Sequence, residues 1–559
     1  MPQPTSVLAV HILIGVASTR FTDWAVSGAL RLPPPTTPYV VHRDLAVPMR
    51  DGVELRADHY QPDTDRALGT ILVRGPYGRS FPFALIYAQI YAARGYHVLF
   101  QSVRGTFGSG GTFVPMVHEV SDAADTVVWL RERPWFTGTF ATLGLSYLGF
   151  TQWALLSDPP PELAAAVITV GPHDLYTSTW GTGAFALNDF LGWADMMAHQ
   201  EQGPLRRLSY QSAAARRMER AVRGLPLGEA GRTLLGRRSP WFETWLAHPD
   251  RDDPFWAPMS MTAALDRCTV PVLLLTGWQD VFLDQTFSQF RHLRGRGVDA
   301  AMTIGPWTHD QMVTRASGVT AAETLSWLGS HLSDRPTPPR PAALRIYVTG
   351  HPRPGWVEMA DLPSAPDEQV FYLQPDRRLG VSAPPAETEG PTFRYDPADP
   401  TPTVGGRLLS RQGGYCDDSG LAQRADVLTF TSAPLQAEIC VCGAPVVELD
   451  HATDNPHFDV FVRISEVDSR GRSRNVSDGF RRFGADPDGP IRLELDAIAH
   501  RFSAGSRIRL LLAGGCHPRF ARNLGTAEPA ISGSRLVPST HTVRLGQCSR
   551  LLLPAAEPG

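Results

Sequence analysis

The chain has 559 residues, of which 43% are hydrophobic and 19% are charged, so it holds enough apolar material for several globular cores, about three or four domains by length. Its formal net charge of -4 excludes an overall basic field of the kind that attracts nucleic acid. Six cysteines are too sparse for a disulfide scaffold, and the closely spaced Cys440 and Cys442 lack the further ligands of a zinc site. We therefore expect buried free thiols and a cytoplasmic location.

Residues 1–38 are expected to form an N-terminal helix and a linker. Residues 7–17 are mainly apolar, but no Arg precedes them and the run is too short to cross a membrane. An amphipathic helix is therefore favoured over a signal peptide or a membrane anchor. The proline-rich residues 32–38 interrupt regular structure and provide the linker.

Residues 39–174 alternate strand-like apolar runs with helical patterns. A hairpin is predicted around Asp51 and Gly52, because apolar and polar residues alternate on both sides of them. Further strands are expected at residues 69–74, 97–103 and 162–171, with helices at 84–91 and 120–131. This alternation predicts crossover units, a mainly parallel, doubly wound sheet and the α/β class.

The stretch 140–150 organises the rest of the chain. A short apolar run leads into the turn Gly144-Leu145-Ser146, and a helical pattern follows. A strand, a sharp turn and a helix with serine at the apex form the arrangement that exposes a nucleophilic hydroxyl. Leu148 departs from the general G-x-S-x-G pattern, since the glycine comes one residue later at Gly149. Alone, Gly-x-Ser is equally typical of an ordinary turn.

The alternation of strands and helices stops in residues 175–267. This segment is rich in tryptophan and contains a helical pattern at 213–223, so we predict a helical cap whose aromatic side chains form its own core. Strand-like runs resume at 270–276 and 301–305, which assigns residues 268–335 to the second part of the α/β domain.

The last part of the chain, residues 336–559, follows a proline-rich linker and changes in kind. Short strands separated by turns are predicted at 344–348, 369–373, 427–430, 444–449, 457–464, 491–495 and 506–512. No comparable helical pattern lies between them. We therefore expect an all-β sandwich with the organisation of a jelly roll.

Three polar residues follow apolar strands in the order that serine hydrolysis requires. In α/β-hydrolases the nucleophile, the acid and the histidine occur in that order, each just after a strand, and here these positions hold Ser146, Asp280 and His309. Taken singly, Asp280 is equally typical of a helix cap and His309 of a structural residue at a strand end. Asp284 and Asp310 are alternatives for the acid, but neither directly follows a strand.

The negative charge of a tetrahedral intermediate needs hydrogen-bond donors. The backbone N–H of Tyr147, directly after the serine, is one candidate. The other belongs to the loop 74–79, either as a backbone N–H or as the phenol of Tyr77, because Pro76 has no N–H to donate. A packing role beside the turn remains open for the Tyr77 ring.

In combination, these motifs resemble the cocaine esterase and X-prolyl dipeptidyl-peptidase family of α/β-hydrolases. The matching stretches are 47–53, 74–77, 103–111, 144–149, 277–280 and 305–309, and in the last domain 475–479, 502–510 and 518–523. The resemblance covers nearly everything after about residue 39. It implies an α/β-hydrolase domain formed by residues 39–174 and 268–335, the helical cap, and a C-terminal jelly roll.

Position by position, the resemblance implies Ser146 as nucleophile, Asp280 as acid and His309 as base. It also implies that Tyr77 supplies its hydroxyl to the oxyanion hole together with the N–H of Tyr147. Asp310 stands where many relatives have glycine, which would place a second carboxylate near the pocket and favour a substrate that carries an amine.

We therefore predict a serine hydrolase that cleaves a small-molecule carboxylic ester or activated amide through an acyl-serine, without a metal or organic cofactor. Neither nucleic acid nor a membrane is expected as a partner, and a homodimer is left open. One alternative is an X-Pro dipeptidyl-peptidase or an amino-acid ester hydrolase, although the cap shows no clear acidic pair for a substrate amine. The other is a non-catalytic protein whose β-sandwich binds a ligand.

Overall fold

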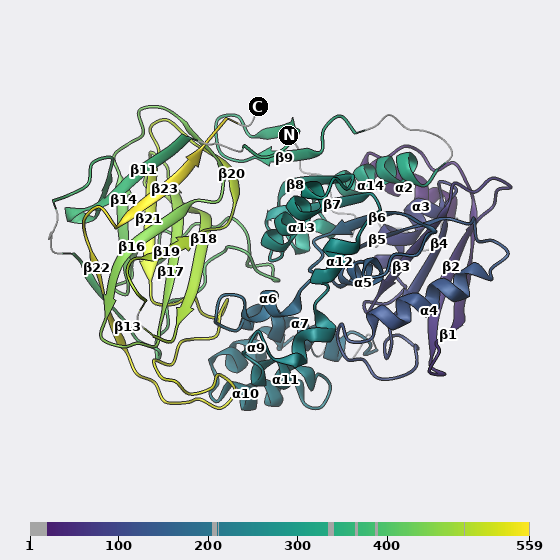
Figure 1. Ribbon diagram of the computed structural model, residues 1–559, viewed down its shortest axis with the longest axis horizontal. Coiled ribbons are helices and arrows are strands. Elements are labelled where there is room, and N and C mark those ends of the chain that lie inside the picture. The colour runs from purple at the N-terminus through teal and green to yellow at the C-terminus, as the bar shows by residue number, and fades with distance from the viewer. Residues whose placement is uncertain are drawn as a thin grey trace. The chain divides into compact units, whose positions relative to one another are not determined.

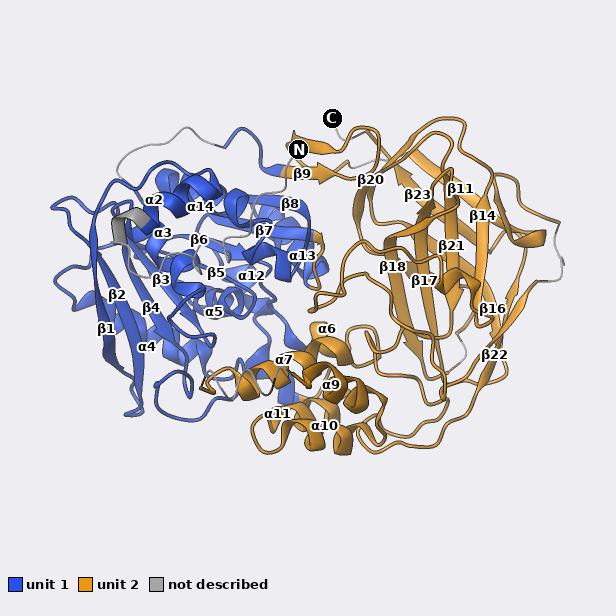
Figure 2. Cartoon of the chain, turned by 180° about the vertical axis from the view of Figure 1, so that it is seen from behind, with its two compact units in different colours: residues 1–175, 254–277, 282–344 blue, residues 176–253, 278–281, 345–559 orange. Residues whose placement is uncertain are grey.

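The computed structural model describes residues 19–203, 210, 212–333, 340–363, 367–385, 390–485 and 487–557. The helix expected within residues 7–17 lies outside these residues. The chain forms two compact units, shown in Figure 2. The first comprises residues 1–175, 254–277 and 282–344, and the second comprises residues 176–253, 278–281 and 345–559.

The first unit is built on the predicted α/β sheet. Its strands are β1 (Tyr39–Pro48), β2 (Glu54–Pro62), β3 (Thr70–Gly75), β4 (His97–Ser102), β5 (Phe140–Leu145), β6 (Leu163–Thr169), β7 (Val272–Gln279) and β8 (Ala300–Thr308). They lie in the order β1-β2-β4-β3-β5-β6-β7-β8. Strands β1 and β2 form the predicted antiparallel hairpin, and β3 to β7 pair in parallel wherever they are neighbours. The α/β class is confirmed.

Helices cover the sheet in two groups (Figure 1). Every residue of β3, β4 and β5 is buried, so both faces of the sheet are covered, as is usual for parallel strands. One packed group is α4 (Glu119–Arg131), α5 (Tyr147–Leu156), α12 (Thr262–Arg267) and α13 (Leu283–Gly295). The other contains α2 (Thr19–Leu30), α3 (Ile90–Ala92) and α14 (Ser317–His331), with the short π-helical turn η1 (Leu85–Gln89) leading into α3.

The predicted cap is helical and belongs to the second unit. Its helices are α6 (Leu175–Trp180), α7 (Leu187–His199), α9 (Ala214–Arg223), α10 (Leu227–Leu235) and α11 (Trp241–Ala247). Trp180, Trp241 and Trp245 are buried, as expected for the core of a cap. The cap is bonded to the β-rich part of the same unit, because the N–H of Arg482 donates to the carbonyl of Thr182 at 2.9 Å.

The rest of the second unit is the predicted all-β domain. Strands β9 (Leu344–Val348) and β10 (Gly355–Met359) precede this domain in the chain and do not belong to its sheet. The strands of the domain are β11 (Asp367–Gln374), β12 (Arg378–Gly380), β13 (Thr392–Tyr395), β14 (Val427–Ser432), β15 (Ile439–Gly443), β16 (Val446–Thr453), β17 (Phe458–Val467), β18 (Ser473–Phe483), β19 (Ile491–Glu494), β20 (Ile498–Phe502), β21 (Arg507–Ala513), β22 (Ser539–Arg544) and β23 (Arg550–Ala555). Alternate side chains of these strands, including Phe430, Val462 and Leu510, form a buried apolar core.

Several of these strands were not predicted from the sequence, and β18 is the longest of them. Its interior side chains include Asn475, Ser477 and Asp478, all buried although polar. The strand therefore lacks the apolar alternation by which strands are found in a sequence. It is held instead by an antiparallel ladder with β17.

The six cysteines all lie in the described part of the chain and are free thiols. Cys268, Cys440, Cys442 and Cys516 are buried as predicted, whereas Cys416 is only half-buried and Cys548 is exposed, which corrects the expectation for those two residues. Burial raises the pKa of the Cys440 thiol to about 11 and that of Cys442 to about 12, so neither is a thiolate at neutral pH.

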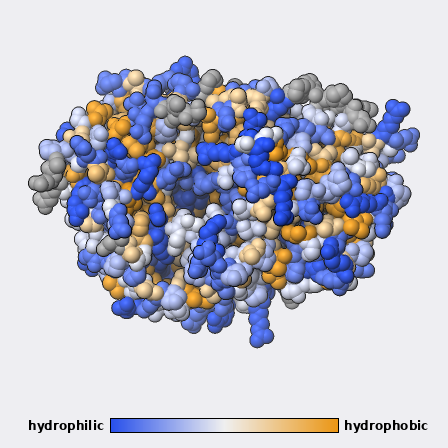
Figure 3. All heavy atoms as spheres, viewed as in Figure 1, coloured by the Kyte–Doolittle hydropathy of each residue, from blue (hydrophilic) through white to orange (hydrophobic). Residues whose placement is uncertain are grey.

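The surface is mixed in character. On the face shown in Figure 3, hydrophobic residues occur in small groups among hydrophilic ones. Among the described residues, no helix combines the length and the apolar character needed to span a membrane.

Candidate active site

Ser146 occupies the tight turn between β5 and α5. Its φ of 56° and ψ of -121° lie outside the regions that residues with a side chain prefer, at a cost of about 1–3 kcal/mol. The turn is fixed at both ends, because the N–H of Ser146 donates to the carbonyl of Thr169 at 2.9 Å and its carbonyl accepts from Gly149 at 2.8 Å. The serine is 9% exposed. This is the strained strand-turn-helix conformation expected for a nucleophile.

Leu148 explains the departure from the general motif. A Cβ atom at Gly144 would stand 2.4 Å from the Cβ of Leu148, and one at Gly75 would stand 2.3 Å from its Cδ1. The leucine side chain therefore fills the space above two glycines, one on β5 and one at the end of β3. Residue 148 can be large because residues 75 and 144 have no side chain.

Gly149 is needed for a different close approach. A Cβ atom there would lie 2.5 Å from the Cα of Gly171, just beyond the end of β6. The helix α5 can therefore pack tightly against the neighbouring strand only with glycine at this position. The shift of the motif glycine by one residue follows from this packing.

The side chain of Tyr147 anchors the beginning of α5. Its hydroxyl donates to Oε1 of Glu119 at 2.8 Å and accepts from the N–H of Met116 at 2.7 Å. Glu119 is paired in turn with Arg74, whose Nη2 lies 3.2 Å from Oε2. Burial raises the pKa of the Glu119 carboxyl, and burial together with the Glu119 charge raises the pKa of Tyr147.

This buried cluster joins the two segments from which the oxyanion donors are predicted to come. Arg74 directly precedes the loop that carries Tyr77, and its carbonyl accepts a hydrogen bond from the hydroxyl of Thr151 on α5 at 3.2 Å. Tyr147 is the first residue of α5, so its backbone N–H lies at the positive end of that helix. Sequence analysis missed Glu119, whose only signal was an acidic residue directly before the helix predicted at 120–131.

Tyr77 lies just after β3 and is half-buried. Its ring stacks on Phe83 with centroids 5.4 Å apart. The phenol is close enough to that of Tyr147 to contribute to the raised pKa of Tyr147. The structure therefore places Tyr77 near Tyr147, the first residue of the helix that follows the serine.

His309 directly follows β8 and precedes the short 3-10 helix η3 (Asp310–Val313). It is 6% exposed, and its ring meets the ring of Phe282 edge to face with centroids 5.4 Å apart. A Cβ atom at Gly277 would stand 2.2 Å from the carbonyl oxygen of Trp307, so the glycine permits β7 and β8 to approach closely. Asp310 is exposed.

Asp280 directly follows β7 and is completely buried. The end of β7, residues 278–281, belongs to the second unit. There the indole N–H of Trp278 donates to the carbonyl of Tyr347 at 2.7 Å. The side chain of Gln279 lies close enough to the phenol of Tyr415 to oppose the burial that raises the pKa of Tyr415. Residues of the β-rich part thus hold the backbone that carries Asp280, a feature that sequence analysis did not anticipate.

Three of the predicted site residues, Ser146, Asp280 and His309, therefore directly follow strands β5, β7 and β8 of one sheet, and Tyr77 comes two residues after the end of β3. Carboxyl ends of parallel strands meet at one edge of a sheet, where the sites of α/β proteins form. Among the described residues, no group of three or more histidine, cysteine or acidic side chains is arranged to hold a metal ion.

Two family models match most of the chain. The X-Pro dipeptidyl-peptidase (S15 family) model matches residues 51–311, and the X-Pro dipeptidyl-peptidase C-terminal non-catalytic domain model matches residues 337–551.

Individual relatives span nearly the whole chain. A cocaine esterase of Rhodococcus sp. (strain MB1 Bresler) is 29% identical over 540 residues, which cover 87% of this chain and 93% of the relative. A putative serine esterase of Mycobacterium tuberculosis (strain CDC 1551 / Oshkosh) is 24% identical over 620 residues, covering 92% of this chain and 95% of the relative.

Solved structures share the complete fold. An aminopeptidase from the marine sediment archaeon Thaumarchaeota archaeon superposes with a TM-score of 0.80 at 23% identity, covering 94% of this chain and 98% of the other. An α-amino acid ester hydrolase gives a TM-score of 0.78 at 22% identity, with coverages of 93% and 97%. Together with the family models and the esterase relatives, these findings show that the chain belongs to the cocaine esterase and X-prolyl dipeptidyl-peptidase family of α/β-hydrolases and is a serine hydrolase.

Proposed function

We propose that the chain hydrolyses a small-molecule carboxylic ester or activated amide through an acyl-enzyme formed on Ser146. The strained turn at Ser146 carries this proposal, since a serine held with φ of 56° between a strand and a helix is the geometry of an exposed nucleophile. The cocaine esterase relative, aligned over most of both chains, supports an ester as the substrate.

In the proposed first half-reaction, the Oγ of Ser146 attacks the carbonyl carbon of the substrate while His309 takes the hydroxyl proton. The oxyanion that forms accepts hydrogen bonds from the N–H of Tyr147 and the phenol of Tyr77. When the intermediate collapses, the bond to the leaving group breaks and the leaving oxygen or nitrogen takes the proton from His309. The acyl group remains on Ser146.

In the second half-reaction, a water molecule attacks the acyl carbon and gives a proton to His309. Collapse of the second intermediate returns that proton to Oγ and releases the carboxylic acid. Asp280 is proposed to hold His309 in one tautomer and to stabilise the imidazolium that forms twice in the cycle. Its complete burial fits this role, because a carboxylate shielded from water interacts strongly with a neighbouring cation.

The test is turnover of p-nitrophenyl acetate and butyrate by the wild type and by Ser146→Ala. We expect the variant to lose at least about 10⁴-fold in kcat. Ser157→Ala is the matched change at the C-terminal end of α5, where the hydroxyl donates to the carbonyl of Trp153 and to the sulfur of Met261, and it should retain full activity. Equal ester turnover by wild type and Ser146→Ala would refute the nucleophile.

The oxyanion assignment has its own test in Tyr77→Phe. The substitution keeps the ring that stacks on Phe83 and removes only the hydroxyl. We expect kcat/KM to fall by roughly 10²- to 10³-fold while thermal stability changes little. An unchanged rate would assign the second donor to a backbone N–H of the loop instead.

A peptidase activity is the second candidate, because the family model that matches residues 51–311 is named for X-Pro dipeptidyl-peptidase. Such a substrate requires acidic groups for its free amine. The buried Asp189 of the cap is already engaged, since it accepts hydrogen bonds from the N–H of Leu409 and from Asn188. Turnover of Ala-Pro-p-nitroanilide above that of the esters would favour the peptidase, and failure to react with a serine-directed phosphonate would favour a non-catalytic protein.

A further inference from the structure

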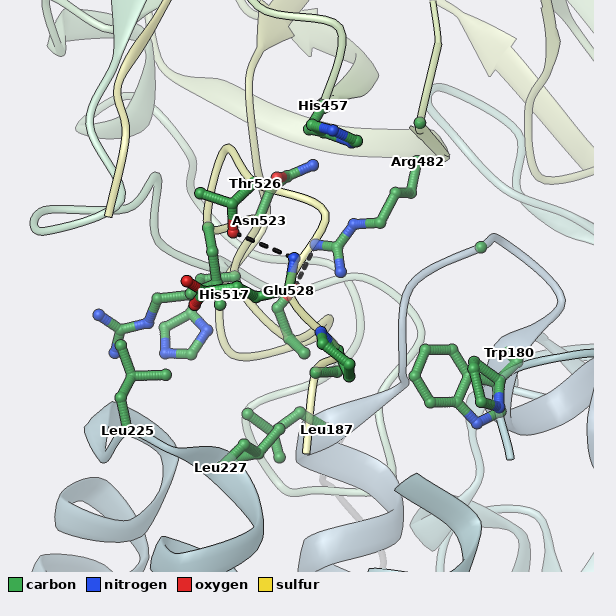
Figure 4. A pocket seen from close by; sticks show the side chains of 18 of the residues that line it. Trp180, Leu187, Leu225, Leu227, His457, Arg482, His517, Asn523, Thr526 and Glu528 are labelled. Atoms are coloured by element: carbon green, nitrogen blue, oxygen red, sulfur yellow. Dashed lines mark hydrogen bonds between the residues drawn. The ribbon is translucent and has the colours of Figure 1, made fainter. Parts of the chain in front are cut away.

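A cavity of about 350 Å³ lies inside the second unit, where the cap meets turns of the β-rich part (Figure 4). Its cap side is largely apolar and includes Leu187, Leu225 and Leu227. Its other side contains His517 and Asn523, from the segment after β21. The volume falls in the range of pockets that take small organic ligands. None of the described residues that line the cavity belongs to the first unit, which contains Ser146.

Most polar groups of the cavity wall are satisfied and held in place. Arg482 donates to both carboxylate oxygens of Asp459 at 2.8 Å and to the carbonyl of Ala521 at 2.6 Å. Asn523 donates to Asp459 at 2.7 Å and accepts from the N–H of Gly525 at 2.8 Å. These groups form a preorganised wall and have little hydrogen-bonding capacity left for a ligand.

His517 is the exception. Its side chain is 7% exposed, and its Nδ1 lies 3.3 Å from the carbonyl oxygen of Phe520, which places the ring proton on Nδ1. Nε2 is buried and makes no hydrogen bond of good geometry among the described residues, although the carbonyl of Val222 lies near the ring. Figure 4 shows the ring on the side of the cavity that faces Leu225 and Leu227. A buried acceptor without a partner costs about 1–3 kcal/mol, which a ligand with a suitable donor would recover.

The electrostatic surroundings keep this ring neutral. Burial, and then the charge of Arg522, lower the pKa of His517 to about 4, although the carbonyls of Phe520 and Val222 act in the opposite direction. Arg223 also opposes a second positive charge. At neutral pH, Nε2 therefore presents a lone pair that accepts a hydrogen bond.

The charged groups around the cavity do not supply an anion site. The guanidinium of Arg522 donates to the carbonyls of Pro397 and Arg223 at 3.1 and 2.9 Å, and that of Arg482 is paired with Asp459. Glu528, also in the wall, accepts hydrogen bonds from the N–H groups of its own loop. An anionic ligand would meet the lone pair of Nε2 with its own acceptor atoms.

We propose that this cavity binds an uncharged ligand with a compact apolar body and one hydroxyl or amine group that donates a hydrogen bond to Nε2 of His517. The apolar body packs against the leucines of the cap, and the donor fixes the orientation of the ligand. Binding bridges the cap and the β-rich part of the same unit.

Phenol is a suitable probe, with anisole and benzoate as its counterparts. Phenol has the required donor, anisole has the same ring without a donor, and benzoate is an anion. In titrations of the full chain followed by ligand-observed NMR, we expect phenol to bind at least about tenfold more tightly than either counterpart, as loss of one hydrogen bond to a buried group predicts. A crystal soaked with phenol should show its hydroxyl at Nε2 of His517.

Two variants separate the site from effects on folding. His517→Phe should weaken phenol about tenfold and abolish its advantage over anisole. Leu225→Trp, which fills the cavity from the half-buried wall, should abolish binding without touching the histidine. His351→Phe, the same substitution at an exposed position of the second unit outside the lining, should leave the phenol affinity unchanged.

Several results would overturn the proposal. Equal affinity for phenol and anisole would remove the role of His517, and tighter binding of benzoate would identify an anion site. An absence of phenol binding up to its solubility limit would mean that solvent alone satisfies Nε2. None of these outcomes depends on the hydrolytic activity proposed for Ser146.

Discussion

Both units bury an arginine-carboxylate pair, but the two pairs have different neighbours. In the first unit, Arg74 and Glu119 are 3.2 Å apart, with 3% and 4% of their side chains exposed. In the second, Arg463 donates to both oxygens of Asp478 at 2.6 and 2.8 Å, with 0% and 3% exposed. Burying either pair costs several kcal/mol per ion, because each charged group loses its hydration.

The difference lies in what each pair holds. The Arg74–Glu119 pair contacts Tyr147, next to the proposed nucleophile, and so fixes a backbone segment that needs a precise position. The Arg463–Asp478 pair links neighbouring strands β17 and β18, and Arg463 also donates to the carbonyl of Val404 at 2.6 Å. The same chemistry therefore supports the proposed catalytic geometry in one unit and the integrity of the fold in the other.

The largest effect is expected from Asp478→Ala. The change leaves the guanidinium of Arg463 buried with one fewer partner, which should lower the free energy of unfolding by about 3–5 kcal/mol. Urea denaturation followed by circular dichroism measures this loss. Asp468→Ala removes a carboxylate from an exposed pair with Arg472 and should cost less than about 1 kcal/mol. Similar losses in the two variants would contradict the structural role given to the buried pair.

A smaller and different effect is expected from Tyr147→Phe. The change removes the hydroxyl that joins Glu119 and the N–H of Met116 but keeps the ring, so the start of α5 loses its anchor. We expect kcat/KM for p-nitrophenyl butyrate to fall about tenfold or more, because small displacements of an oxyanion donor slow acyl transfer strongly. Stability should fall by about 1–3 kcal/mol, since a buried donor is left unsatisfied.

Tyr395→Phe is the matched control in the second unit. Its hydroxyl is also buried and donates to a backbone carbonyl, that of Asn523 at 3.3 Å. This variant should lose stability but retain the full rate of ester hydrolysis. If both tyrosine variants had the same rate, the anchor at Tyr147 would be merely structural.

The comparison also shows where sequence analysis succeeds. In the first unit, β3, β5 and β7 are buried on both faces, so their residues form continuous apolar runs that end near the predicted site residues. This pattern allowed the strands, the turn at Ser146 and the order of Ser146, Asp280 and His309 to be found. The α/β fold and the all-β C-terminal domain were accordingly predicted correctly.

Contacts between residues far apart in the chain could not be predicted from the sequence alone. The strand β18 was missed because Asp478 is satisfied by Arg463 and Arg519, partners that a single sequence does not reveal. Glu119 was missed for the same reason, since Arg74 and Tyr147 lie 45 and 28 residues away. Polar residues with buried partners look like surface residues in a sequence, and only the fold shows which of them carry function.

The smallest effect concerns two buried histidine pairs, one in each unit. Nε2 of His59 lies 3.0 Å from Nδ1 of His97, and Nε2 of His451 lies 3.0 Å from Nδ1 of His541. Burial, reinforced by the neighbouring histidine, lowers the pKa of His59 to about 3 and that of His541 to about 3, from an ordinary value of 6.5. His59 and His541 are therefore neutral in the folded protein at neutral pH.

These pKa values fix the sign of the pH dependence. Below pH 6.5 these histidines are protonated in the unfolded chain but stay neutral in the folded chain. The free energy of unfolding that each neutral histidine contributes is therefore complete above pH 6.5 and is lost as the pH falls toward about 3. When the pH is lowered by one unit from 6.5, His59→Phe and His541→Phe should each lose about 1 kcal/mol less free energy of unfolding than the wild type. Denaturant unfolding at a series of pH values measures these slopes. A slope equal to that of the wild type in both variants would show that the two pairs do not couple protonation to folding, whereas a change in only one would show that the two units differ in how firmly they exclude a proton.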